Sequence, residues 1–271
     1  MIKSKLHKLS FLATSVLFAN AAHAFFPFVT DDTGTQGRGG SQIEFDYGFE
    51  KSHDDEISED DGRVIGTATG ISNAFSSTYT YGVTENVDVF AGLAYQSNAP
   101  RGWQNTEIGA KWVFAGDQTK GWSTAIKPSV LLPVTKSMQD NGLGSADTNL
   151  SLTLVSSYLA DTHELHINAG YASNWYKTTE LTPSGSERTN LWSVSAAPVL
   201  VLNNQWKAGL DLGISTNPNF DSDYTVFGEI GLQYSPLENL QFGLGLMVNS
   251  NVNSTTSSWN YQIATGLAYQ F

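Results

Sequence analysis

The sequence has 271 residues, no cysteine and a formal net charge of −12 at pH 7. This acidity argues against nucleic acid and anionic membrane surfaces as partners, because both carry negative charge. The absence of cysteine excludes a lipoprotein and a secreted domain held together by disulfides.

Residues 1–24 predict a secretory signal peptide. Three of the first eight residues are lysine, residues 11–22 are largely apolar, and Ala22-His23-Ala24 is a small-x-small cleavage site. The apolar segment is too short and wrongly flanked to remain as a spanning helix. Cleavage after Ala24 would leave eleven Lys and Arg against 26 Asp and Glu, so the mature chain is still more acidic. No apolar run in that chain approaches the length of a helical membrane span.

Residues 25–40 have no strand period and form an N-terminal arm. Phe25, Phe26 and Phe28 are apolar, and a polar, glycine-rich segment containing Asp31 and Asp32 follows them. Phenyl rings left free in water are unfavourable, so we expect the arm to pack against the rest of the chain. The two aspartates beside Thr and Gly also fit a calcium loop, although the same residues are typical of a polar turn.

Residues 41–271 alternate apolar and polar side chains with a period of two. This pattern is typical of strands with one apolar and one polar face, and it predicts about twelve of them. Very short turns alternate with longer polar loops between the strands. The predicted strands are 41–53, 64–81, 87–97, 103–115, 121–134, 147–160, 164–176, 188–202, 205–217, 223–235, 240–250 and 258–271.

The last strand carries the longest unbroken alternation. Apolar, aromatic or β-branched residues occupy every odd position from Trp259 to Phe271, and small or polar residues occupy the even positions. Ending on an aromatic residue in this pattern resembles the C-terminal strand of bacterial outer-membrane β-barrels. The resemblance implies that Phe271 is an assembly signal read by the barrel-assembly machinery.

The tryptophans fall at two levels of the predicted strands. Trp103, Trp175, Trp192 and Trp259 lie near the long loops, whereas Trp112, Trp122 and Trp206 lie near the short turns. Two aromatic girdles facing outer-membrane lipid explain this banding, and a soluble β-sandwich does not. We therefore predict an all-β fold, a transmembrane antiparallel up-and-down β-barrel of about twelve strands, in which the last strand closes against the first.

The polar faces of these strands would line the lumen. A barrel of this size is wider than the eight-stranded kind that side chains fill, and narrower than a porin. Its charged residues either pair internally and fill the bore, or line a pore that selects solutes by size and charge. The predicted lining residues are Glu44, Asp46, Glu50, Asp88, Glu107, Lys111, Lys127, His166, Lys207, Asp211 and Glu229.

The segment Pro27-Phe28-Val29-Thr30-Asp31-Asp32-Thr33-Gly34-Thr35-Gln36-Gly37, together with the terminal Phe271, resembles the outer-membrane family labelled "putative MetA-pathway of phenol degradation". The resemblance implies a porin-like channel or transporter for small solutes, including aromatic or hydrophobic compounds. It also implies residence in the outer membrane of a Gram-negative bacterium. We further predict that the arm, with Phe25, Phe26, Phe28, Asp31 and Asp32, tucks into the periplasmic mouth as a plug or gate.

An outer-membrane enzyme that modifies or hydrolyses lipid is the alternative. It would need a histidine and a serine as neighbours, and the mature histidines are His53, His163 and His166. The sequence contains no Gly-x-Ser-x-Gly and no His/Asp cluster with zinc spacing. We therefore predict no enzyme activity, catalytic residue, cofactor or metal site. A structural or adhesive barrel would need longer loops than these.

Overall fold

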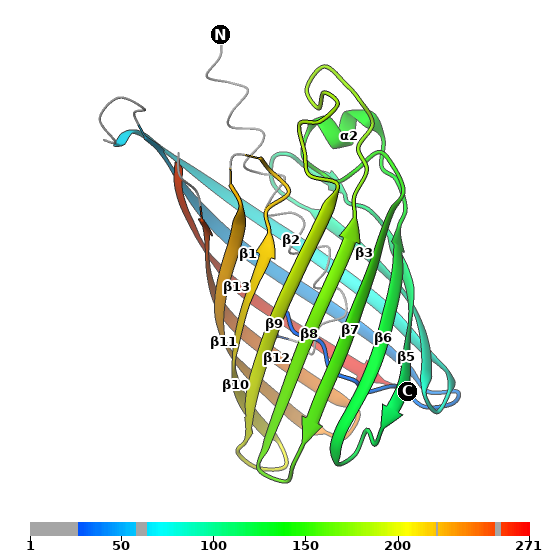
Figure 1. The fold of residues 1–271 in the computed structure, drawn as a ribbon. Coiled ribbons are helices and arrows are strands. Elements are labelled where there is room, and N and C mark those ends of the chain that lie inside the picture. Colours follow the sequence, from blue (N-terminus) through cyan, green and yellow to red (C-terminus); the bar gives the residue numbers. More distant parts are fainter. Residues whose placement is uncertain (1–26, 58–63, 221, 253–255) are drawn as a thin grey trace.

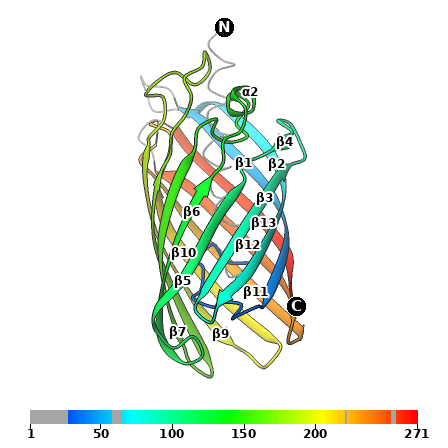
Figure 2. The ribbon, with the colours of Figure 1, turned by 90° about the vertical axis from the view of Figure 1, so that its right-hand side faces the viewer.

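The computed structural model describes residues 27–57, 64–220, 222–252 and 256–271, which fold into one closed antiparallel barrel (Figures 1 and 2). The signal peptide, Phe25 and Phe26 lie outside the described residues. The elements are β1 (Ser41–Ile57), β2 (Val64–Thr84), β3 (Val87–Gln96), β4 (Gly102–Trp103), β5 (Glu107–Gly116), β6 (Gly121–Leu131), α2 (Lys136–Asp140), β7 (Asn149–Leu159), β8 (His163–Ser173), β9 (Asn190–Val201), β10 (Trp206–Thr216), β11 (Tyr224–Leu237), β12 (Leu240–Val252) and β13 (Thr256–Gln270).

Closure of the barrel is between the first and last strands. β13 pairs with β12 on one side and with β1 on the other, so neither sheet edge is left open. The two-residue β4 pairs only with β3, and the other twelve strands form the wall. The predicted fold class and the predicted closure are both confirmed.

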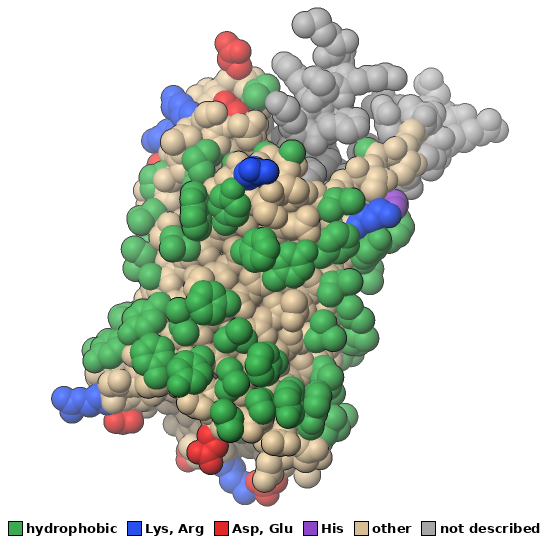
Figure 3. Space-filling view, turned by 180° about the vertical axis from the view of Figure 1, so that it is seen from behind, with side chains coloured by type: hydrophobic (Ala, Val, Ile, Leu, Met, Phe, Trp, Pro, Cys, Tyr) green, Lys and Arg blue, Asp and Glu red, His purple; other side chains and the backbone are tan. Residues whose placement is uncertain are grey.

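The outside of the barrel is apolar and the inside is polar, as the alternation predicts. Along β11, for example, Tyr224 and Ile230 are exposed whereas Glu229 and Gln233 are buried. Figure 3 shows apolar side chains covering the flank, with charged side chains concentrated near its two ends. Such a surface suits lipid, because closure lets paired strands satisfy their backbone polar groups within the sheet. Six of the seven tryptophans are exposed on this surface: Trp103, Trp112, Trp122, Trp175, Trp192 and Trp259.

The largest differences from the predicted elements occur in three places. β1 continues through the acidic residues to Ile57, because it pairs with both β13 and β2 there and its backbone hydrogen bonds outweigh the loop-like sequence. The predicted strand 103–115 is broken into β4 and β5, and the Asn105 side-chain amide between them bonds the carbonyls of Leu132 and Ser145. The predicted loop 135–146 contains the short helix α2, which Thr135 caps.

Within the described residues, no helix has the length and apolarity needed to cross a membrane.

The predicted assembly role of Phe271 can be tested by removing its ring. Its main-chain N–H and C=O bond Ser41 at 2.9 and 3.0 Å, and its ring lies 6.5 Å from that of Tyr79. Phe271→Ala keeps the main-chain pairing and removes the ring, so we expect less folded barrel in the outer-membrane fraction but unchanged conductance of the barrels that do insert. Unaltered insertion would leave the ring without an assembly role.

Candidate functional site

The described part of the N-terminal arm, residues 27–40, runs inside the barrel towards its short-turn end and then turns into β1 (Figures 1 and 2). Phe28 lies against β9, β10 and β11 with its side chain 1% exposed, and it packs on Ala197 and Val199. A Cβ added at Gly209 would lie 2.7 Å from the Phe28 ring, and one at Gly231 would overlap the ring as well. The two glycines are register partners, so together they make the slot that the ring fills.

This slot belongs to a row of small residues that crosses six strands, from β10 to β2. Starting from Gly209, each member is paired with the next in the strand register. Because small side chains project little from the wall, this row leaves space for the arm in this part of the bore. Its members are Gly209, Gly231, Gly245, Ala264, Gly48 and Ala74.

Thr30 fixes the next part of the arm to β10. Its N–H donates to Asp211 Oδ2 at 2.7 Å and its hydroxyl donates to Asp211 Oδ1 at 2.6 Å. The Thr33 N–H donates to Ser157 Oγ at 3.1 Å, and that oxygen lies 2.9 Å from His166 Nδ1. All five of these side chains are buried. Hydrogen bonds to charged groups in such surroundings are among the stronger ones, so the arm is held specifically.

Asp31 lies between two lysines of the opposite wall. Lys127 Nζ is 2.6 Å from Asp31 Oδ2, and Lys111 Nζ is 3.2 Å from Oδ1. The Lys111 ammonium also donates to the carbonyls of Asp32 and Gly34 at 3.0 and 3.1 Å. Both Asp31 oxygens, considered above for calcium, therefore contact ammonium groups.

Asp32 is the arm's second carboxylate. Burial by itself raises the pKa of Asp32, but the charges of Lys111 and His166 and the Gly34 N–H outweigh burial and hold that pKa below its usual value. The Gly34 N–H donates to Asp32 Oδ1 at 2.8 Å. Asp32 thus stays ionised while the arm is docked.

The lowered pKa of Asp32 predicts how arm docking depends on pH. A carboxyl whose pKa is lowered in the folded state contributes stability above its ordinary value of 3.8 and loses it as pH falls through the lowered value. The contribution of Asp32 to arm docking should therefore be constant from neutral pH down to about 4 and decline below it. The difference in the protease-accessible fraction of the arm between the natural protein and Asp32→Asn, recorded against pH, measures this contribution. A difference that already changes between about pH 7 and 5 would contradict it.

The arm's end is held near the short turns. The Thr35 N–H donates to Gln118 Oε1 at 2.9 Å, and the Gln36 N–H donates to Asp88 at 3.0 and 3.2 Å. The Gly39 N–H then donates to the carbonyl of Gly82 at 2.8 Å. Contacts therefore follow the arm along its whole described length.

The structure places all eleven predicted lining residues on the inward face of the wall. Four of them bond the arm directly, namely Asp88, Lys111, Lys127 and Asp211, and His166 is linked to it through Ser157. Glu44, Asp46 and Glu50 instead contact neighbouring polar side chains of the wall: Gln42, Ser76 and Gln262.

Three residues of the site were missed by the sequence analysis. Glu164 lies 2.7 Å from Lys207 Nζ and 3.4 Å from His166 Nε2. Glu164 is two positions from His166 on β8, so the period-two alternation predicts that it faces inward as well. Thr30 and Thr33 carry no such signal, because the arm has no period.

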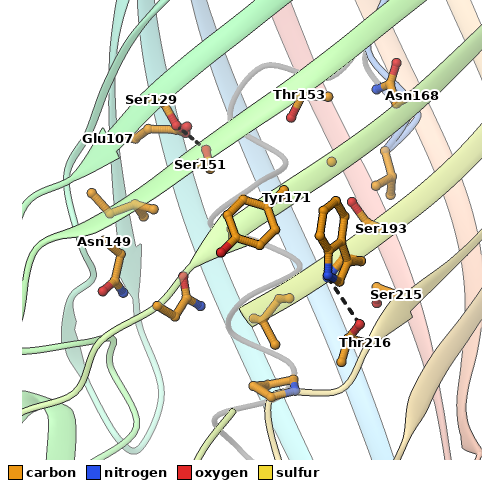
Figure 4. Close-up of a pocket in the computed structure, with 18 of the residues that line it drawn as sticks. Glu107, Ser129, Asn149, Ser151, Thr153, Asn168, Tyr171, Ser193, Ser215 and Thr216 are labelled. Atoms are coloured by element: carbon orange, nitrogen blue, oxygen red, sulfur yellow. Dashed lines mark hydrogen bonds between the residues drawn. The ribbon is translucent and has the colours of Figure 1, made fainter. Parts of the chain in front are cut away.

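The arm separates two cavities of the bore, and Asp31 lines both. The cavity towards the long loops has a volume of about 180 Å³, and the one at the short-turn end about 160 Å³. Figure 4 shows hydroxyl and amide groups around the first, including Ser129, Ser151 and Ser193, with Glu107 at one side. Val29 and Asp31 of the arm complete its lining. The second cavity is more acidic, with Asp32, Glu44, Asp88 and Lys111 in its wall.

A closed antiparallel barrel with an apolar belt and a polar lumen has the architecture of an outer-membrane β-barrel. The chain belongs to the family described as "Putative MetA-pathway of phenol degradation", whose model matches residues 27–271.

Two solved structures share the fold at low sequence identity. An outer membrane channel from Pseudomonas putida F1 is 11% identical with a TM-score of 0.64, covering 89% of this chain and 98% of that one. A Pseudomonas aeruginosa FadL homologue is 8% identical with a TM-score of 0.51, covering 88% and 92%. No curated protein matches the sequence.

Proposed function

We propose that the protein is an outer-membrane channel for small solutes, including aromatic compounds, and that the N-terminal arm closes it at rest. The observation that carries the proposal is the position of Asp31, which contacts two wall lysines and lines the cavities on both sides of the arm. Moving this one segment would join the two cavities into a continuous path. The pairing of the lumen charges with the arm thus favours a gate over a permanently filled bore.

The first cavity supports an aromatic-sized solute. Its volume of about 180 Å³ is comparable to the roughly 150 Å³ of an engineered protein cavity that binds benzene. Leu131, Leu143 and Phe227 supply apolar surface, and the serine and threonine hydroxyls supply neutral polar contacts. The family description, which names phenol degradation, agrees with a solute of this size.

The proposal includes where the protein works. Removal of residues 1–24, insertion by the barrel-assembly machinery and residence in the outer membrane of a Gram-negative bacterium all fit this architecture. The short-turn end would then face the periplasm, so the arm would close the periplasmic half of the bore.

Ligand binding tests the solute class. Titration of the purified barrel with small monoaromatic compounds should give saturable binding, measured calorimetrically. Ser193→Trp, which fills the first cavity from β9, should weaken it at least about tenfold by occupying the volume. Ser184→Trp changes an exposed serine of the loop between β8 and β9, outside the set that lines this cavity, and is the matched control. Binding that survives Ser193→Trp would place aromatic solutes elsewhere.

The alternative, a hydrolytic barrel, has one observation in its favour. Ser157 Oγ lies 2.9 Å from His166 Nδ1, and His166 Nε2 lies 3.4 Å from Glu164 Oε2, which is the order of a nucleophile, a base and an orienting acid. Against it, Ser157 is fully buried and accepts the Thr33 N–H, and Glu164 also pairs with Lys207. We propose that this group anchors the arm.

A serine-directed probe separates the two interpretations. Fluorophosphonate treatment of the folded barrel should leave Ser157 unmodified, because the arm covers its hydroxyl. Labelling that is lost in both Ser157→Ala and His166→Ala, together with ester hydrolysis, would make the protein an enzyme.

A further inference from the structure

Half of the barrel wall carries carboxylates but no lysine or arginine on its described inner face. Among the described residues of β11, β12, β13, β1, β2 and β3, Lys51 is the sole Lys or Arg, and it lies over the outward-facing Tyr261 ring at 6.0 Å. The lysines that enter the bore stand on β5, β6 and β10. The inward carboxylates of this half are Glu44, Asp46, Glu50, Asp88 and Glu229.

Glu229 is the most isolated of these carboxylates. It is 1% exposed, and neither of its side-chain oxygens has a hydrogen-bond partner among the described residues. The Val29 N–H approaches it from the arm, but no hydrogen bond of ordinary geometry forms. By contrast, Glu50 accepts from Gln262 Nε2 at 2.8 Å and Asp211 accepts from Thr30. A buried carboxylate without a partner is strongly unfavourable, so a positive group or a proton must accompany it.

A cavity of about 50 Å³ lies beside this carboxylate. Glu229 and Asp46 both line it, and small residues of the row described above, Gly48, Ala74 and Ala264, keep it open. Pro27 of the arm covers it. About 10–15 Å³ of such space holds one water, so the cavity admits an ion of ammonium or potassium size with a few waters and is too small for an aromatic ring.

We propose that this cavity is a binding site for one monovalent cation of ammonium size, held by the Glu229 carboxylate with Asp46 as the second acidic group. The charge matches, since the described lumen wall offers no lysine on this side. No group of three or more acidic or histidine ligands occurs among the described residues, which disfavours a divalent metal. A cation here would lie beneath the arm and stabilise its docked position.

The positive group beside Glu229 can come from two sources. One is a free K⁺ or NH₄⁺ ion that enters from solution. The other is the chain's own α-ammonium group, because cleavage after Ala24 would place it on Phe25, two residues before Pro27 and within about 7 Å of chain length.

Anomalous scattering from thallium(I), a potassium-sized ion, tests the free-ion source. Crystals of the mature barrel soaked in a thallium(I) salt should show a peak beside Glu229, absent in Glu229→Gln. Glu107→Gln, another buried lumen carboxylate with an oxygen that lacks a partner, should keep the peak and is the matched control. If Glu229→Gln fails to insert, Ala264→Val, which reduces the cavity and leaves both carboxylates, should lose the peak too.

Amine acetylation at neutral pH tests the other source. An α-ammonium group held by Glu229 should acetylate about tenfold more slowly in the natural protein than in Glu229→Gln, with no thallium peak in either. Equal acetylation rates combined with no thallium peak would overturn the proposal and leave Glu229 as a buried neutral acid.

Discussion

Replacing Asp31 by asparagine is expected to turn a channel that is mostly closed into one that is mostly open. The Asp31 carboxylate is 2.6 Å from Lys127 Nζ and 3.2 Å from Lys111 Nζ, and the three side chains are 7–12% exposed. Removing one partner of a buried pair costs roughly 3–5 kcal/mol. Since about 1.4 kcal/mol is a factor of ten, the balance between docked and released arm should shift by roughly a hundredfold to a few thousandfold.

The open fraction in planar-bilayer recordings measures this shift. Asp117→Asn is the matched control, because the Asp117 carboxylate bonds Thr119 in the exposed turn between β5 and β6. If Asp31→Asn, like Asp117→Asn, keeps the open fraction of the natural protein, the Asp31 pairs do not hold the channel closed.

The second large effect is expected from Phe28→Ala. Deleting a buried phenyl ring typically costs about 3–5 kcal/mol, and here the loss falls on the contact between the arm and the Gly209–Gly231 slot. The barrel does not depend on this ring for its strand pairing, so its unfolding temperature should hardly change. Proteolysis of the arm in reconstituted barrels should instead accelerate by more than about a hundredfold.

Phe242→Ala serves as the comparison, since Phe242 is exposed on the outer surface of β12. Gly231→Val approaches the same contact from the wall and should release the arm as Phe28→Ala does, because its side chain would occupy the ring's position. An arm that stays protected in both Phe28→Ala and Gly231→Val would refute the anchoring role of the slot.

The strand alternation predicts most of the barrel. A period of two assigns each residue to one face, so the inward direction of Asp88, Lys127 and Glu229 follows from parity alone. The strand ends are less predictable: β1 runs on through Asp54 and Asp55, because pairing on both sides outweighs the loop-like composition. The alternation likewise does not predict which residues of neighbouring strands pair with each other. Gly48 and Gly231 read as unremarkable small residues until the pairing aligns them in one row.

Only part of the arm's structure can be predicted from the sequence. Its phenylalanines predict burial, and Phe28 is buried. The partners of Thr30 and Asp31 are out of reach, because those contacts join residues 181 and 96 positions apart in a segment without a period. Only the closed barrel brings Asp211 and Lys127 to opposite sides of the same short stretch.

The current through single barrels, with and without residues 25–36, tests the central claim most directly. The full mature chain should conduct little. The shortened barrel should show stable, larger steps with a preference for cations, since half of its wall carries carboxylates and no inward lysine. Equal conductance of the two folded proteins would contradict the account, because the arm would then not be what closes the bore.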